Sequence, residues 1–573
     1  GGMSAAHAFR IALEGDLLGA IGAGDVAVSD SRGDLRTGLV SAGNGATNPG
    51  GVRLAVTDGS LGQLQGRGLT IGGDWLELDV AGGVGTAAAP VQLAMHRDSD
   101  DAGAGGVRGA VGGSAWLTSD HDIAFGGTTA ASGFRVGGDL LVEQTGGDTR
   151  VLHGVTIDGD VALSSSGSLS VLAPVAEAIR AGGHNGVVSR RGDISLTTAG
   201  LEMAAGTRLE TLQPWGAIDA AFAGDATLAR VTARGGRLDL RATGTIGAAA
   251  AGRAILESSG NANLEAGAGV AVDHVVAGGD VSLSAGRNLA VQRVTSGGDQ
   301  RLAAESGRLV FASLAADGDV VGTSRGHLLG DRLTQCLSIT DCRSVNAAGN
   351  IRLSAHGAGS DVRLHGLRST GGAIAVDAAR DLHIGQAANG ELRSRAGIDF
   401  RSVDAARDVG LAAARDLVVF DVQSGGDQAH RAGRDFRFED LRARDTLDSA
   451  SIRHTRGGTV RADGGLRMTA GYSGGHVARR GSTMALDAIR TPRATLQATG
   501  WLEVGEAWLR QGARLGAESL DVGIRSLDSS SPLALEVLGA RTDSAAERFH
   551  MDIRGTDRFR FDQMQAWQIT FSS

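Results

Sequence analysis

The chain has 573 residues, with 91 Gly, 6 Pro, a single Tyr and an aromatic content of only 3%. A set of globular domains of this length normally carries more aromatic bulk, and a disordered chain lacks recurring Leu and Val, so the composition favours a long folded array of repeats. The formal net charge is −9 and every positive charge is Arg, which gives no electrostatic case for nucleic acid or an anionic membrane as a partner.

The first three residues, Gly-Gly-Met, are expected to be a cloning scar in front of an internal fragment. No apolar run reaches the roughly 18 residues that span a bilayer, and the start of the chain lacks the charged, apolar and small-residue order of a signal peptide. We therefore expect no membrane insertion and place targeting signals outside the given sequence.

Residues 4–480 repeat a Gly-Asp signature that is followed by alternating apolar residues. The repeat is most regular from Gly278 to Val320, where three Asp residues follow one another at intervals of 19 and 20 and three apolar positions recur 20 residues later: Leu289, Val291 and Val294 become Leu309, Phe311 and Leu314. A fixed period predicts stacked units, and alternation with a period of two predicts strands with one buried face. Glycines supply the sharp turns between strands.

Units of about 20 residues, with two or three short strands and turns of Gly, Asp and Asn, predict an all-β chain folded as a long right-handed parallel β-helix. Loop insertions are expected near residues 94–113 and 174–186, the second with one short helical turn after Pro174. Residues 481–573 have fewer glycines and heavier side chains. They are expected to form the terminal coils, with a C-terminal cap as one interpretation.

Two cysteines, Cys336 and Cys342, lie six positions apart with no His beside them, so a structural zinc site lacks its four ligands. The spacing favours a local disulfide that closes a loop, in keeping with an oxidising or extracellular setting. Two unpaired buried thiols are the alternative, because so short a loop gains little stability from closure.

Two tripeptides match the integrin-type motif, namely Arg32, Gly33 and Asp34, and Arg191, Gly192 and Asp193. Because Gly-Asp is also the turn signature of the repeat, chance is the alternative explanation.

A second set of candidates is the Arg at the other turn of the repeat: Arg287, Arg308, Arg380, Arg407, Arg415 and Arg434. Stacked coils would align several of these into a ladder that binds sulfated glycans. The alternative, which we favour, is that Arg and Asp alternate along the coils and neutralise one another.

Two further motifs are weaker. The segment GYSGG, with Ser473 at its centre, matches the G-x-S-x-G pattern, but no helix is expected after it and Ser473 is interpreted as a turn residue. The acidic segment at Asp98 lacks the closing Glu of a calcium loop. We predict no catalytic residue, no cofactor and no metal site.

The segments GGDVSLSAGRNLAV, GGDQRLAAESGRLVF and ARDLVVFDVQSGGD resemble the haemagglutinin repeats of the filamentous haemagglutinin family, exoproteins that leave Gram-negative bacteria by two-partner secretion. The resemblance covers roughly residues 10–470. It implies a non-catalytic adhesin filament segment, secreted or on the bacterial surface, that attaches to host cells or other bacteria through a host receptor or glycan. It also implies export of the parent through an outer-membrane two-partner secretion transporter, and a monomeric rod.

Two alternatives remain open. Relatives in contact-dependent growth inhibition imply a structural stalk that only spaces a distal domain. A polysaccharide-degrading β-helix is the enzymatic alternative, but it needs paired carboxylates and aromatic platforms, which this composition does not favour.

Overall fold

The computed structural model describes most of the chain: residues 9–13, 16–43, 50–64, 67–95, 106–126, 133–172, 185–249, 253–330, 344–385, 402–473, 476–526, 533–539, 549–554 and 559–565. The expected cloning scar, the helical turn after Pro174, the acidic segment at Asp98 and both cysteines, Cys336 and Cys342, lie outside the described residues. Those expectations stay predictions. The chain divides into two compact units, Gly1–Gly286 and Arg287–Ser573.

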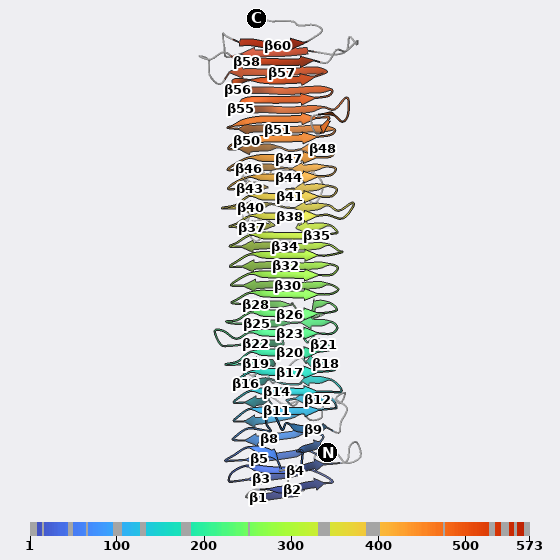
Figure 1. Cartoon of the computed structure of the whole chain (residues 1–573), viewed down its shortest axis with the longest axis vertical. Helices are drawn as coiled ribbons and strands as arrows, with labels where there is room; N and C mark the ends of the chain where they lie inside the picture. The colour runs from blue at the N-terminus through green and yellow to red at the C-terminus, as the bar shows by residue number, and fades with distance from the viewer. Residues whose placement is uncertain are drawn as a thin grey trace. The chain divides into compact units, whose positions relative to one another are not determined.

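Each unit is a parallel β-solenoid, which confirms the predicted fold class. Within a unit, every coil runs through short strands that pair in parallel with the equivalent strands of the next coil, as the stacked arrows in Figure 1 show. The described residues contain only strands, bridges and turns, and none forms a helix that could cross a membrane.

In much of the first unit, each coil contributes three strands. A regular series comprises β14 (Leu140–Gln144), β17 (Val161–Ser165), β20 (Ile194–Thr198), β23 (Ile218–Phe222) and β26 (Leu238–Ala242). Their first residues are in register and fully buried, so branched apolar side chains stack in one column through the core. Alternate side chains point outward, as expected for strands with a period of two.

The second unit shows the predicted register most clearly. Strand β32 (Leu289–Ser296) pairs in parallel with β34 (Leu309–Ala316), and Leu289 lies opposite Leu309. The other two predicted pairs, Val291 with Phe311 and Val294 with Leu314, are also formed. Coils average about 22 residues, slightly more than expected, because several carry insertions between strands.

The Gly-Asp signature has a structural role that runs from coil to coil. A side-chain oxygen of the Asp or Asn in one coil accepts the backbone N–H at the same turn of the next coil. Asp299, for example, accepts the N–H of Asp319 at 2.8 Å, and Asp319 accepts that of Asn350 at 2.6 Å. We call this series the Asx ladder. Its described acceptors include Asp25, Asp34, Asp122, Asp139, Asp148, Asp160, Asp193, Asp225, Asn261, Asn288, Asn350, Asp408 and Asp427.

Towards the end of the second unit the strands lengthen. Strand β55 spans Met484–Ala498 and β56 spans Trp501–Ala517, and the two pair in parallel with an irregularity between Thr491 and Arg493. Parallel pairing then continues through β57 (Ser519–Ser526), β58 (Leu533–Gly539), β59 (Phe549–Arg554) and β60 (Phe559–Gln565).

Candidate functional site

Both Arg-Gly-Asp tripeptides lie in turns that expose the Arg and Asp side chains, and their carboxylates belong to the Asx ladder. An oxygen of Asp34 accepts the backbone N–H of Ser60 at 2.9 Å, and an oxygen of Asp193 accepts that of Ala217 at 2.8 Å. Each Asp therefore has a structural reason to be present. Integrin binding by either motif stays a prediction.

Part of the predicted Arg set forms a series of ion pairs between coils of the second unit. Arg380 shows the geometry: its Nε and Nη2 donate to the two oxygens of Asp361 at 2.6 and 2.5 Å. Each Arg reaches back to the Asp one coil earlier, and we call the series the Arg–Asp ladder. Its pairs are Arg380 with Asp361, Arg415 with Asp381, Arg434 with Asp416 and Arg453 with Asp435.

The aspartates of this ladder are mostly buried, whereas the guanidinium groups remain about half exposed. Burial of Asp361 by itself raises the pKa of its carboxyl, but the hydrogen bonds and positive charge of Arg380 outweigh that effect and hold the pKa below its ordinary value. The same contact raises the pKa of Arg380. Both groups are therefore charged at neutral pH, and the pair stabilises the stack.

The other three predicted arginines, Arg287, Arg308 and Arg407, are exposed. Within the described part of the chain, none of them forms an ion pair. Binding of a sulfated glycan by the six arginines stays a prediction, and for the paired ones it would compete with the Arg–Asp ladder.

A polar cleft in the second unit is a candidate for a binding site. Four strands lie side by side beneath it: β47 (Gln428–Ala432), β50 (Thr446–Ser451), β52 (Gly465–Ala470) and β55. Arg431, Thr469 and Gln497 lie in one outward row across these strands, and Asp448 and Arg467 lie in the neighbouring row. We call it the Tyr472 cleft, after the residue that borders it.

A short antiparallel hairpin forms the border of this cleft. It consists of β53 (Tyr472–Ser473) and β54 (His476–Val477) and follows directly after β52. Gly471 makes the bend possible, because its φ is +86° and a Cβ there would lie 2.2 Å from the Thr499 hydroxyl. The returning chain is fixed by the N–H of Ala478, which donates to the Gly471 carbonyl at 2.8 Å.

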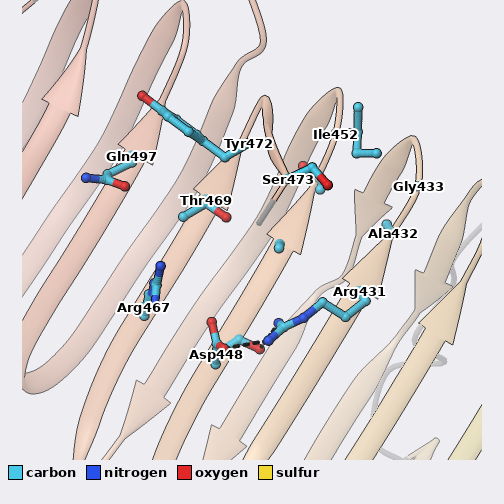
Figure 2. Close-up of a pocket in the computed structure, with 12 residues that line it drawn as sticks. Arg431, Ala432, Gly433, Asp448, Ile452, Arg467, Thr469, Tyr472, Ser473 and Gln497 are labelled. Atoms are coloured by element: carbon cyan, nitrogen blue, oxygen red, sulfur yellow. Dashed lines mark hydrogen bonds and ion pairs between the residues drawn. The ribbon is translucent and has the colours of Figure 1, made fainter. Parts of the chain in front are cut away.

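Figure 2 shows Tyr472, Thr469 and Gln497 grouped at one side of the cleft, with the Arg431–Asp448 pair at the other and Arg467 between them. Nη2 of Arg431 donates to Asp448 at 2.5 Å, so this cation is held in place. Arg467 has no ion pair among the described residues. Burial and the negative charge of Glu518 raise the pKa of the Tyr472 phenol, which stays protonated at neutral pH.

The cleft thus offers a flat phenol ring, an amide, a hydroxyl and an uncommitted guanidinium group. These are donors and acceptors suited to sugar hydroxyls and to an anionic substituent. Its one lining carboxylate, Asp448, is already paired with Arg431. The arrangement is suited to binding, and it does not place two free carboxylates around a scissile bond.

A second cleft in the same unit has a different lining. It contains carboxylates and cations, with Gly457 and Gly458 also in its lining. The charged and aromatic residues include Glu439, Asp487, Glu503, Trp501, Arg437, Arg453, Arg456 and His454. Asp440 lies opposite Thr459, and Gly457 lies opposite Leu486. This register places Glu439 and Asp487 on the two sides of Gly458, about two strand spacings or roughly 9 to 10 Å apart at the backbone. We call it the Glu439 cleft.

The sequence did not predict either cleft. Ser473, interpreted as a turn residue, lies in strand β53 of the hairpin, and His476 is its cross-strand neighbour, but both side chains are exposed. The signal that was available is the interruption of the strand pattern between Ala470 and Met484, which contains the only Tyr of the chain.

Among the described residues, no group of three or more His, Cys, Asp or Glu side chains is arranged to hold a metal ion. In comparisons with known proteins, no family model, no curated protein and no solved structure matches the chain.

Proposed function

We propose that the chain is a segment of a secreted or surface-displayed bacterial adhesin, which attaches to host cells or other bacteria without catalysing a reaction. The family resemblance of the repeats is one support. The observation that carries the proposal is the Tyr472 cleft, a polar site on an outer face of the solenoid. The repeated Asp side chains and many of the Arg side chains, by contrast, hold neighbouring coils together.

A solenoid of this kind suits attachment because its two ladders fix each coil on the next. Side chains that are not needed for stacking are then presented on a rigid surface, so little conformational entropy is lost when a ligand binds. In the Tyr472 cleft, Arg431 donates to the Asp448 carboxylate and to the His430 and Asp448 carbonyls, and Thr469 is largely buried in the floor. The host ligand we propose is a cell-surface glycan, bound by Tyr472, Arg467 and Gln497.

The test is attachment of the purified chain to epithelial cells, comparing wild type with the Tyr472→Ala and Gln497→Ala double variant. Trp508→Ala, which removes a partly exposed aromatic residue from another strand, is the matched control. We expect at least a tenfold loss of attachment in the double variant and none in the control. Equal attachment by all three proteins would remove the Tyr472 cleft from the proposal.

The Glu439 cleft favours a second candidate, a β-helical polysaccharide-degrading enzyme. Its lining includes the carboxylates of Glu439, Asp487 and Glu503, and inverting glycosidases act through two carboxyl groups roughly 6.5 to 9.5 Å apart. This candidate predicts new reducing ends from a polysaccharide panel with wild type, and none with Glu439→Gln. Absence of product from every polymer would count against this enzymatic candidate.

A further inference from the structure

A turn in the first unit carries an aromatic side chain that the fold does not use. The turn comprises residues 212–217, between β22 (Arg208–Thr211) and β23. Trp215 lies within it, with 71% of its surface exposed. The corresponding turns of the coils before and after span only residues 190–193 and 234–237, so the extra length lies at the Trp215 turn.

The three turns lie directly side by side. Asp193 accepts the N–H of Ala217 at 2.8 Å on one side, and on the other the N–H of Gly236 donates to the Gly216 carbonyl at 3.1 Å. Gly235 allows this approach, because a Cβ there would lie 1.5 Å from the carbonyl carbon of Pro214. The Trp215 turn is therefore held at one strand spacing, about 4.8 Å, from each neighbour.

Both neighbouring turns carry arginines. Arg191, in the preceding turn, is exposed and forms no ion pair within the described part of the chain. Arg234, in the following turn, is held by Glu210, whose Oε1 accepts from its Nε at 2.9 Å and its Nη2 at 2.7 Å. The same carboxylate also pairs with Arg208 at 2.8 Å, so two guanidinium groups share one negative charge.

Two further arginines at these turns have only loose partners. Arg190 lies 3.4 Å from Asp158, and Arg237 lies 3.3 Å from Asp219. Exposed pairs of this kind contribute about 0 to 1 kcal/mol each, so an anionic ligand can replace them at little cost. The surface around Trp215 thus combines a flat apolar ring with guanidinium groups on both sides.

We propose that this Trp215 surface binds an acidic polysaccharide. A sugar ring packs on the exposed indole face, and its carboxylate or sulfate group lies against Arg191, whose planar guanidinium group binds such an anion through two parallel hydrogen bonds. Arg234, which is held by Glu210, adds positive charge on the other side. A protein partner would instead require a broader apolar patch around the aromatic anchor. In this turn Leu212 is the other exposed large apolar side chain, at 39%, and the remaining neighbours of Trp215 are Gln213, Pro214 and Gly216. The proposal names a ligand class for the adhesin and in that sense rests on the function proposed above.

The test measures binding of the purified chain to three soluble polymers: polygalacturonate, dextran sulfate and neutral dextran. We expect wild type to bind at least one charged polymer and not dextran, and Trp215→Ala to bind at least tenfold more weakly. Trp215→Phe should retain most of the affinity, and Trp508→Ala should retain all of it. Comparable binding of dextran, or unchanged binding by Trp215→Ala, would overturn the proposal.

The arms of the test also separate the two anion sources and the two proposals. Preference for polygalacturonate identifies the carboxylate as the recognised group, and preference for dextran sulfate identifies the sulfate. Asp193→Asn keeps an acceptor for the Ala217 N–H and should bind as wild type does, whereas loss of binding in that variant would contradict an anionic ligand. Because soluble polymers are used, the result stands whether or not the chain attaches to cells.

Discussion

His430 gives the most quantitative prediction about stability. It lies in the core column of the second unit, between Leu411 and Ser449 in register, and its side chain is fully buried. Its ring lies 5.3 Å from that of Phe436, and its Nε2 is 3.1 Å from the Gln428 amide oxygen. Burial, reinforced by the positive charge of Arg431, lowers the pKa of His430 from 6.5 to about 3.

The sign of the pH dependence follows from this difference. Between about pH 6.5 and pH 3 the unfolded chain binds a proton at His430 that the folded chain does not, so stability is full above pH 6.5 and falls as the pH decreases. At pH 5, which is 1.5 pH units below the ordinary pKa of 6.5, the free energy of unfolding is lower by about 2 kcal/mol, at about 1.4 kcal/mol per pH unit. His430→Leu, which places the side chain of the neighbouring coil at this position, should not show that loss.

The assay is urea unfolding followed by circular dichroism, which gives the free energy of unfolding at pH 7.5 and at pH 5. The decrease in this free energy between the two pH values is compared across variants. That difference should be about 2 kcal/mol smaller for His430→Leu than for wild type. His356→Leu, which removes an exposed His of the same unit, should behave as wild type. An equal pH-dependent loss in wild type and His430→Leu would refute the reasoning.

Three further predictions concern the ladders, each measured by urea unfolding. Arg415→Leu removes the two hydrogen bonds that Arg415 donates to the buried Asp381 carboxylate and should lower the free energy of unfolding by about 1 to 3 kcal/mol. Arg461→Leu, from an exposed pair with Asp463, should lower it by less than about 1 kcal/mol, and equal losses would contradict the Arg–Asp ladder. Ionised Asp361 stabilises the fold at pH values above its ordinary pKa of 3.8, and this contribution is lost as the pH falls through its lower pKa in the folded state. Asp361→Asn should therefore make the free energy of unfolding depend less on pH in the acid range. An unchanged dependence would count against the pairing with Arg380. Asp319→Ala removes the acceptor of the Asn350 N–H and should lower the free energy of unfolding by about 1 kcal/mol. Asp319→Asn keeps an acceptor and should lower it by less. The reverse order would exclude the Asx ladder.

The fold could be predicted because two periods coincide in the sequence. Alternation with a period of two gave the strands, and recurrence every 20 residues gave the register, so the opposition of Leu289 and Leu309 followed directly. Where the core column contains Gln428 and His430 instead of branched apolar residues, the pattern disappears although the coil continues. There the hydrogen bonds of Gln428 to backbone carbonyls replace apolar contact.

The candidate sites were harder to predict because they depend on neighbouring coils. The sequence places an Asp beside Arg415, but its two-bond partner is Asp381, which is 34 residues earlier. The Trp215 surface likewise joins turns that begin at Arg190, Leu212 and Arg234, which only the coil register brings together. The Tyr472 cleft depends on a hairpin that interrupts the repeat, and repeat-based reasoning gives no information about an interruption.

The central claim, attachment, is tested most directly by measuring the binding of fluorescently labelled wild-type chain to epithelial cells and to bacterial cells. The account predicts saturable binding to at least one of these surfaces, displaced by an excess of unlabelled chain. Folded protein that shows no saturable binding to either surface would contradict the adhesin proposal and would favour the structural stalk.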